Sequence, residues 1–319
     1  MKHLTMSSKM NQKIKHKRRH LDGILLLDKP KGMTSNHALQ RVKRLFNAEK
    51  AGHSGTLDPM ATGMLPICFG EATKFAGQLL DKDKQYQFTC KLGEKTATGD
   101  EEGEIIEMCS PPQNLTQEKL NNVLQQFMGE IEQVPPMVSA LHHNGKRLYE
   151  LAREGIEVER KPRLITISAL TLDHLGEYEF TATVTCSKGT YVRVLAEDIA
   201  QKLDTAGHLT MLRRLAIDPF IDTPMVSLET LETLINNDPN PLQLDQFLYP
   251  IDHALTDLPI LTFNAMDSDR ILHGQRIHIE GTLEQPLYRL YNDQNQFLGI
   301  GAPHTPTSIG PKRIIQPRI

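Results

Sequence analysis

Residues 53–71, reading HSGTLDPMATGMLPICFGE, are the most informative stretch of the 319-residue chain. They place one acidic residue, Asp58, between two glycines and directly before Pro59. Glycine adopts backbone angles closed to other residues, and proline fixes its own φ and disfavours the helical region for the residue before it. The pattern predicts a stiff loop that holds the Asp58 carboxylate, followed by an apolar strand at 64–69. Such a loop suits a nucleophile or a base, and the alternative is an Asp-Pro turn in which Asp58 caps its own backbone.

The composition is that of an ordinary globular protein, with 39% hydrophobic and 24% charged residues, and the length favours one large domain plus a small one. The four cysteines are scattered without CxxC spacing, which predicts neither a zinc site nor a disulfide scaffold and fits a reducing cytoplasm. No apolar run is long enough for a membrane span, and the basic start lacks the apolar core of a signal peptide. We therefore expect a cytoplasmic protein without membrane association.

The charge is unevenly distributed along the chain. The net charge is −3, but residues 1–20 carry seven Lys or Arg and no acid, which leaves 29 basic against 39 acidic residues in the remainder. We expect this basic tail to be disordered. It either makes non-specific phosphate contacts or has no defined role, and the sequence favours neither alternative.

Apolar periodicity predicts alternating strands and helices through the first two thirds of the chain. The first predicted helix follows a cap at Thr34 or Ser35. The predicted strands are 23–27, 84–92 and 178–186, and the further predicted helices are 71–80, 117–127 and 191–203.

Two segments depart from this pattern. Residues 134–165 are rich in cations and poor in core positions, which indicates an excursion from the main sheet. After a composition break at 236–241 (NNDPNP), short β segments at 287–291 and 297–301 flank an Asn-Asp-Gln-Asn turn and predict a small barrel-like module. The sequence thus predicts an α+β body with a small β appendage.

Four motifs in order closely resemble the TruB family of bacterial tRNA pseudouridine-55 synthases, and the resemblance spans roughly residues 21–315. The motifs are GILLLDKPKGMTS (23–35), HSGTLDPMATGMLPICFGEATKF (53–75), KQYQFTCKLG (84–93) and CSKGTYVRVLAEDIA (186–200). The resemblance implies a catalytic domain at 21–250 with a mixed, mainly antiparallel sheet flanked by helices. It also implies a thumb-like insertion at about 134–165 and a PUA-like RNA-binding domain at 251–319.

The family reaction breaks the N1–C1′ bond of uridine 55 in the T loop of tRNA, turns the uracil and joins C5 to C1′. No redox change occurs and no atom is lost, so we expect no cofactor and no metal. The resemblance makes Asp58 the catalytic carboxylate. Attack on C1′, addition to C6 of the base and removal of the C2′ proton remain open, and all three need an ionised carboxylate.

The resemblance assigns three supporting residues to the active site. Arg193 in GTYVR matches the arginine that pairs with the aspartate and lowers its pKa, although its position alone also fits a surface cation at a helix start. Tyr86 is assigned to stacking on the target uracil, with core packing as the alternative. Leu212 in TMLRRLAI matches the leucine that lines the base pocket.

Further residues are predicted to contact RNA. By resemblance His53 fills the space that the flipped nucleotide leaves, while Lys29 and Lys31 are either phosphate contacts or loop supports. The thumb contributes Lys146, Arg147 and Arg153, and His208 is placed near the wall of the base pocket. Two positions depart from the family, Val138 for an aromatic residue and His142 for a lysine, and they put the tRNA affinity in question but not the chemistry.

Other classes of function share some of these sequence features. A guide-RNA-dependent synthase of the dyskerin-like branch shares the aspartate loop but lacks such a thumb. An RNA-binding or tRNA-folding module is also compatible with the basic tail and the thumb. A glycosidase lacks a second carboxylate at a recognisable position. The leading prediction is an enzyme that binds the tRNA T arm as a monomer and needs no protein partner.

Overall fold

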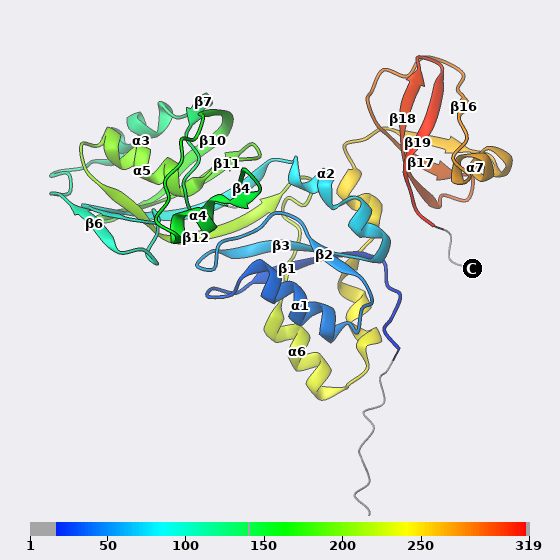
Figure 1. Cartoon of the computed structure of the whole chain (residues 1–319), viewed down its shortest axis with the longest axis horizontal. Helices are drawn as coiled ribbons and strands as arrows, with labels where there is room; N and C mark the ends of the chain where they lie inside the picture. The colour runs from blue at the N-terminus through cyan, green and yellow to red at the C-terminus, as the bar shows by residue number, and fades with distance from the viewer. Residues whose placement is uncertain (1–16, 140, 317–319) are drawn as a thin grey trace, which may run out of the picture.

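The computed structural model describes residues 17–139 and 141–316, so most of the predicted basic tail lies outside the described residues. The described chain forms a body built on a large sheet and a separate five-stranded module (Figure 1). The strands are β1 (Gly23–Lys29), β2 (Ala51–His53), β3 (Thr62–Phe69), β4 (Lys84–Leu92), β5 (Glu94–Thr96), β6 (Ile105–Met108), β7 (Gly129–Gln133), β8 (His142–His143), β9 (Lys146–Arg147), β10 (Arg163–Leu175), β11 (Glu179–Cys186), β12 (Gly207–Ile217), β13 (Val226–Ser227), β14 (Leu248–Tyr249), β15 (Ile260–Phe263), β16 (Ile277–His278), β17 (Tyr288–Asn292), β18 (Phe297–Thr305) and β19 (Ser308–Ile314). The helices are α1 (Ser35–Leu45), α2 (Ala76–Leu80), α3 (Gln117–Gln125), α4 (Leu148–Arg153), α5 (Val192–Lys202), α6 (Leu228–Asn237) and α7 (Ala265–Leu272), with 3₁₀ turns η1 (Gly70–Lys74), η2 (Pro241–Phe247) and η3 (Ile251–Leu255).

The large sheet is mixed and mainly antiparallel, as predicted. Its strand order is β13-β1-β3-β12-β4-β11-β10-β7, with β14 beside β1 and β2 beside β3. The β1–β13 and β3–β12 pairs are parallel, and the other neighbours are antiparallel. The β3–β12 pair consists of two registered positions, Arg213 with Thr62 and Arg214 with Gly63. This narrow junction joins the two halves of the sheet.

Both faces of the central strands are covered, which explains the uninterrupted apolar run of β1. Successive side chains of a strand point to opposite faces. Leu25 and Leu27 therefore pack into the core that includes α1, α3, α5 and α6, while Ile24 and Leu26 pack against η1, α2 and η3. Burial of each of these four side chains stabilises the folded protein by about 1.5–3 kcal/mol relative to an exposed side chain.

The predicted helix start is confirmed at Thr34, whose hydroxyl accepts a hydrogen bond from the His37 N–H. The prediction of one helix at 71–80 is wrong. The chain forms η1, then the single residue Phe75, then α2, and Leu80 is exposed instead of buried. Gly77 and the β-branched Thr73 weaken the helix, and packing of Ala72, Phe75 and Leu79 against the sheet decides the local path.

The C-terminal module has its own small core. Its strand order is β15-β17-β18-β19-β16, and the predicted segments 287–291 and 297–301 correspond to β17 and the start of β18. Phe263, Leu290 and Ile309 are buried inside it, and Ile300 packs into the core of the body. This arrangement confirms an α+β body with a small C-terminal β domain.

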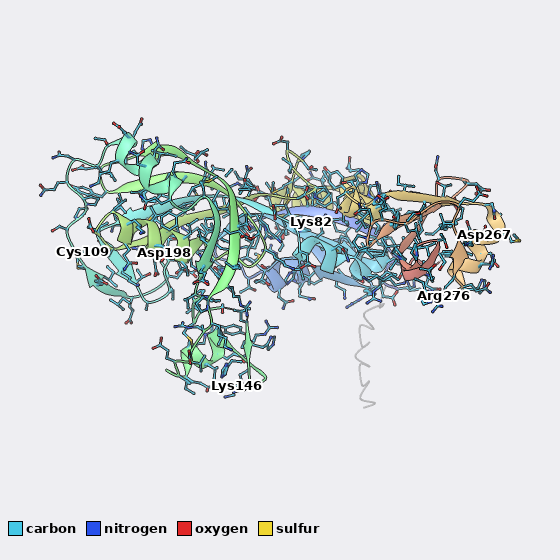
Figure 2. All side chains as sticks on the ribbon, turned by 90° about the horizontal axis from the view of Figure 1, so that it is seen from above. Lys82, Cys109, Lys146, Asp198, Asp267 and Arg276 are labelled. Carbon is cyan, nitrogen blue, oxygen red and sulfur yellow. The ribbon has the colours of Figure 1, made fainter. Side chains whose placement is uncertain are left out.

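The excursion from the main sheet that the sequence predicts at 134–165 follows β7 and extends to Pro162, and we call it the thumb. It contains β8, β9 and α4, and the chain rejoins the sheet at Arg163 in β10. Figure 2 shows Lys146 near the end of a segment that projects from the body. Among the described residues, no helix is long and apolar enough to cross a membrane.

Substitution of Gly63 tests the β3–β12 junction. Gly63 has φ +97°, and a Cβ there would lie 2.1 Å from the Arg214 carbonyl oxygen, so we expect Gly63→Ala to lower the free energy of unfolding by about 3 kcal/mol or more. Urea unfolding measures this difference. Gly32→Ala is the control, because Gly32 has φ +77° but nothing within 4 Å, and its cost should be about 1 kcal/mol. Equal costs for the two variants would show that the junction is not tightly packed.

Candidate active site

A pocket lies beside the β3–β12 junction, with Asp58 in its wall. Its volume is about 180 Å³. The lining residues come from the β2–β3 loop, the sheet, the root of the thumb and the start of α5: Thr56, Leu57, Asp58, Tyr86, Ser139, Thr190, Tyr191, Val192, Arg193 and Leu212. Segments far apart in the sequence therefore meet at Asp58.

The Asp58 loop is held from both sides. The Ser35 hydroxyl accepts from the Leu57 N–H at 2.8 Å and donates to the Leu57 carbonyl at 3.0 Å. The Gly32 N–H donates to the Pro59 carbonyl at 2.8 Å, and the Ala61 N–H donates to the Asp58 carbonyl at 3.1 Å. The turn is thus closed by the backbone, and the Asp58 side chain is left to pair elsewhere. The alternative of a side chain that caps its own turn does not apply.

Arg193 is the partner of Asp58. It lies in the first turn of α5, and its Nε is 3.1 Å from Oδ2 of Asp58. Only 4% of Arg193 is exposed, so the surface-cation alternative is wrong. Its Nη1 donates to the Thr98 carbonyl at 2.7 Å and its Nη2 to the Val138 carbonyl at 2.9 Å. A buried guanidinium is stable only with such a set of partners, and here they fix its orientation toward Asp58.

Asp100 is a residue that the sequence analysis missed. It is buried, and its carboxylate lies 3.6 Å from Nη1 of Arg193. The Thr98 hydroxyl donates to Oδ1 of Asp100 at 2.5 Å, and the Thr96 hydroxyl donates to its backbone carbonyl at 2.6 Å. Arg193 therefore sits between two carboxylates. The signal available in the sequence was an acidic residue in a Thr-Gly-Asp turn, which is common in surface loops.

The pKa of the Asp58 carboxyl is raised above its ordinary value. Burial is the main cause and repulsion from Asp100 adds to it, whereas Arg193 and Lys29 lower it. Although 39% of the Asp58 side chain is exposed, that surface lines the narrow pocket, where little water can solvate the charge. Arg193 lowers this pKa, as expected, but burial outweighs the arginine and the net shift is upward.

Arg214 is a second functional residue that the sequence analysis did not assign. It is almost fully buried, its Nε donates to the Met64 carbonyl at 2.7 Å and its Nη2 donates to the Gly55 carbonyl at 2.9 Å. The neighbouring Arg213 makes two hydrogen bonds to Asp28, at 2.9 and 2.8 Å. Consecutive arginines in a strand point to opposite faces, so this pair ties β12 to β1, to β3 and to the Asp58 loop.

Tyr86 and Leu212 lie where a planar base could be held. Both line the pocket, Tyr86 from β4 and Leu212 from β12. Burial raises the pKa of the Tyr86 phenol, so the ring is neutral at ordinary pH. A neutral aromatic ring and an aliphatic side chain suit contact with the faces of a nucleobase.

The prediction of an RNA contact is wrong for Lys29, and the loop-support alternative is correct. Lys29 is fully buried, and its Nζ donates to the carbonyls of Met33 at 2.7 Å, Pro30 at 3.0 Å and Pro59 at 3.3 Å. Burial lowers the pKa of its amine to about 8. Lys31 is exposed and forms an ion pair with Glu101 at 2.5 Å.

The two predicted histidines differ in position. His53 is half-buried at the end of β2, and burial followed by repulsion from Arg214 lowers its pKa, which favours the neutral ring. Its Nδ1 is buried and has no hydrogen-bond partner among the described residues. His208 is buried in β12 with Nδ1 3.0 Å from the Glu94 carbonyl, so the prediction that it contacts RNA is wrong.

The predicted thumb cations are exposed and lie outside the pocket. Lys146 pairs with Glu154 at 3.2 Å, and the Arg153 guanidinium lies 5.5 Å from the centre of the Tyr149 ring. Arg147 is exposed at the start of α4. The structure therefore separates these cations from the Asp58 pocket and presents them on the projecting segment. Within residues 17–139 and 141–316, no group of three or more His, Cys, Asp or Glu side chains could hold a metal ion.

Two solved structures share the fold of this chain. The chain matches the "Crystal Structure of a Cbf5-Nop10-Gar1 Complex" with a TM-score of 0.69 at 23% identity, over 88% of this chain and 78% of that chain. It matches a structure of an H/ACA RNP bound to a substrate RNA containing 2′-deoxyuridine with a TM-score of 0.71 at 20% identity, over 93% and 86%. At these identities the similarity shows the fold alone, which is that of the pseudouridine synthases.

Sequence comparison gives the family. Residues 43–192 match the TruB family pseudouridylate synthase N-terminal domain, 193–256 the tRNA pseudouridylate synthase B C-terminal domain, and 259–315 the C-terminal domain of pseudouridine synthase II TruB. A tRNA pseudouridine synthase B of Methylobacillus flagellatus is 47% identical over 95% of this chain and 98% of its own length. The corresponding protein of Vibrio vulnificus is 46% identical over 94% and 97%. The chain belongs to the TruB family, and it is an enzyme that isomerises uridine to pseudouridine in tRNA.

The raised pKa of Asp58 predicts that kcat/KM falls on the acid side of its pH profile. A carboxyl with a raised pKa is protonated at a higher pH than an ordinary aspartate, so kcat/KM should be lost as the pH falls through that value. Asp100→Asn removes a repulsion that raises this pKa, so the acid limb should move to lower pH. Because Arg193 also loses one of its partners, we expect kcat to fall about tenfold. The pH dependence of kcat/KM on an unmodified tRNA transcript measures the shift of the acid limb, and the rate at saturating transcript measures kcat.

Glu101→Gln is the matched control for Asp100→Asn. Glu101 is the adjacent residue, but it pairs with Lys31 and is not among the groups that shift the pKa of Asp58. Its acid limb should coincide with that of the unsubstituted enzyme. An acid limb that does not move in Asp100→Asn would contradict the coupling between the two carboxylates.

Proposed function

We propose that this enzyme isomerises uridine 55 in the T loop of tRNA, with the Asp58 carboxylate acting at the glycosidic bond of a flipped-out nucleotide. The observation that carries the proposal is the ion pair between Asp58 and the buried Arg193 inside a pocket walled by Tyr86 and Leu212. The similarity to the tRNA pseudouridine synthase B proteins and the four sequence motifs support the choice of target site.

The geometry supports a separate role for each side chain of the pocket. Arg193 holds the Asp58 carboxylate in one orientation and favours its ionised form against the effect of burial. Tyr86 and Leu212 hold the detached uracil while it turns, the N1–C1′ bond is replaced by a C5–C1′ bond, and the proton that leaves C5 is balanced by one gained at N1. Attack on C1′, addition to C6 and removal of the C2′ proton all need the same ionised carboxylate and remain alternatives.

RNA must be deformed to reach this pocket. A uridine inside a folded tRNA elbow cannot contact a carboxylate in the wall of a pocket, so the nucleotide has to flip out. The neutral His53 ring lies at the end of β2, five residues before Asp58, and we propose that it occupies the space left in the RNA loop. We also propose that Lys31, which is exposed and pairs with Glu101, contacts a phosphate of the RNA.

We propose that residues 21–250 form the catalytic unit, that the thumb grips the T arm, and that residues 251–319 form a PUA-like RNA-binding domain. The separate core of the C-terminal module and the exposed cations of the thumb support these assignments. We further propose that the enzyme acts in the cytoplasm as a monomer without a protein partner, because the described chain carries both the pocket and the thumb.

The departures from the family at Val138 and His142 affect binding more than chemistry. The contact of Val138 with Arg193 runs through the backbone carbonyl, so it does not depend on the side chain. His142 is exposed in β8, where its backbone lies opposite that of Arg147 in the neighbouring strand β9. Its effect is therefore expected in tRNA affinity.

Asp58→Asn tests the central assignment. We expect the variant to lose isomerisation by at least about 10³-fold, because the amide cannot act as nucleophile or base, and to bind tRNA with nearly the affinity of the unsubstituted enzyme. Tritium release from 5-tritiated uridine in an unmodified tRNA transcript measures the reaction, and a filter-binding assay measures affinity.

A transcript with cytidine at position 55 is the control for the site of reaction. The unsubstituted enzyme should release one equivalent of tritium from the normal transcript and none from the control. Full turnover by Asp58→Asn would refute the role of Asp58, and release from both transcripts would move the target to another uridine. Release from neither would favour a tRNA-folding module.

The thumb assignment predicts a separate effect on binding. Lys146→Ala combined with Arg153→Ala removes two exposed cations from the thumb, so the Kd for tRNA should rise about fivefold while kcat at saturating tRNA stays unchanged. Lys119→Ala removes an exposed cation from α3 and should change neither value. A decrease in kcat at saturation without a change in Kd would contradict this role of the thumb.

A further inference from the structure

We propose that four cations at the end of α1 form a second RNA-binding surface, which contacts phosphates of tRNA outside the T arm. The four residues, which we call the α1 basic patch, are Lys17, Arg18, Lys43 and Arg44. The inference rests on the proposed function, because it takes the T loop to lie at Asp58.

The start of the described chain is anchored beside the end of α1. The Arg19 N–H donates to the Asn47 carbonyl at 2.7 Å, and the Glu49 N–H donates to the Arg19 carbonyl at 2.9 Å. The Arg19 guanidinium pairs with Asp245 at 2.5 Å and donates to the Pro241 carbonyl at 3.0 Å. The Asn47 side chain also donates to the Lys17 carbonyl at 3.2 Å. Lys17 and Arg18 are therefore held next to the last turn of α1, which carries Lys43 and Arg44.

The positive charge of this patch is not neutralised locally. Lys17, Arg18 and Arg44 are exposed and Lys43 is half-buried, and none of the four has an ion pair with another described residue. The neighbouring acids already have other partners: Asp245 pairs with Arg19, Glu232 with Arg41, and Glu49 with His20. An unpaired group of cations on a chain with a net charge of −3 indicates an anionic partner.

A purely structural explanation covers only half of the patch. Cations in the last turn of a helix interact favourably with its dipole, which accounts for Lys43 and Arg44. It does not account for Lys17 and Arg18, which precede the first strand. Nor does it account for four more lysines within residues 1–16, a stretch without any acid. A dense cluster of Lys and Arg without acids matches the phosphate backbone of a nucleic acid.

The position of α1 relative to Asp58 fits a long RNA. Ser35 at the start of α1 is hydrogen-bonded to Leu57, the residue before Asp58. Lys43 and Arg44 lie eight and nine residues after Ser35, and a helix rises 1.5 Å per residue, so these two cations lie about 12–14 Å along α1 from that end of the loop. In Figure 2 the blue N-terminal part of the ribbon lies toward the side of the body from which Lys146 projects. An RNA whose T loop lies at Asp58 and whose backbone follows α1 would reach the patch with phosphates outside that loop.

The test compares two RNAs on one variant of the full-length chain. The variant carries Lys17→Ala, Arg18→Ala, Lys43→Ala and Arg44→Ala, and its Kd is measured over a series of KCl concentrations. One RNA is the complete unmodified tRNA transcript, and the other is its isolated T-arm stem-loop. We expect the Kd for the complete tRNA to rise about tenfold or more. The slope of log Kd against log KCl concentration should decrease by about one for each phosphate contact that is lost. The Kd for the stem-loop should not change.

Lys202→Ala is the matched control. Lys202 is an exposed cation in the last turn of α5, so its loss removes the same kind of helix-dipole interaction without touching the patch. It should change the Kd of neither RNA. An unrelated RNA duplex of the same length as tRNA serves as the control for non-specific binding, and the patch variant should lose little affinity for it.

Three results would overturn the inference. An equal rise in Kd for the complete tRNA and for the stem-loop would show that the cations contact the T arm. A rise in Kd no larger than that of Lys202→Ala would show that the patch is a solvated surface without an RNA contact. Equal weakening for tRNA and the unrelated duplex would make the contact non-specific. Failure of the proposed function would give a different result. The unsubstituted enzyme would then form no pseudouridine in either the transcript or the stem-loop.

Discussion

The architecture depends on the junction at which β3 and β12 meet over two registered positions. Gly63 lets the two backbones approach so closely that no side chain fits between them, and the buried Arg214 bridges from β12 to the carbonyls of Met64 and Gly55. The cost of burying this guanidinium is offset only because its hydrogen-bond donors reach fixed carbonyls. The same bridge holds the Asp58 loop, so the element that joins the halves of the sheet also positions the candidate catalytic carboxylate.

The electrostatics of the site follow from a second buried arginine. Arg193 lies between Asp58 and Asp100, and it donates to the carbonyls of Thr98 and Val138. Burial raises the pKa of Asp58 and Arg193 lowers it, with burial the larger effect, so the pocket solvates the carboxylate poorly while the arginine favours its ionised form. A carboxylate with little solvation and a fixed orientation is more reactive than one in water, which is consistent with the role that we propose for Asp58.

The thumb and the pocket are connected through the same arginine. Val138 and Ser139 lie at the root of the thumb, where one contributes a carbonyl to Arg193 and the other lines the pocket beside Tyr191. The cations of the thumb and of the α1 basic patch are not among the residues that line the pocket. This division keeps RNA affinity and chemistry on different residues, although the whole chain has a net charge of only −3.

The sequence by itself determined the class of the fold, the family and the central aspartate, because these depend on local patterns. Alternation in β4 and β11, the cap at Thr34 and the glycines around Asp58 are readable without contacts. Only the tertiary structure decided which charged side chains are buried. Lys29 and His208 resemble surface residues in the sequence but support the backbone from inside, and Asp100 and Arg214 belong to the site through partners more than forty residues away. Burial of a charge depends on distant groups that satisfy its hydrogen bonds, and these groups come together only when the sheet is complete.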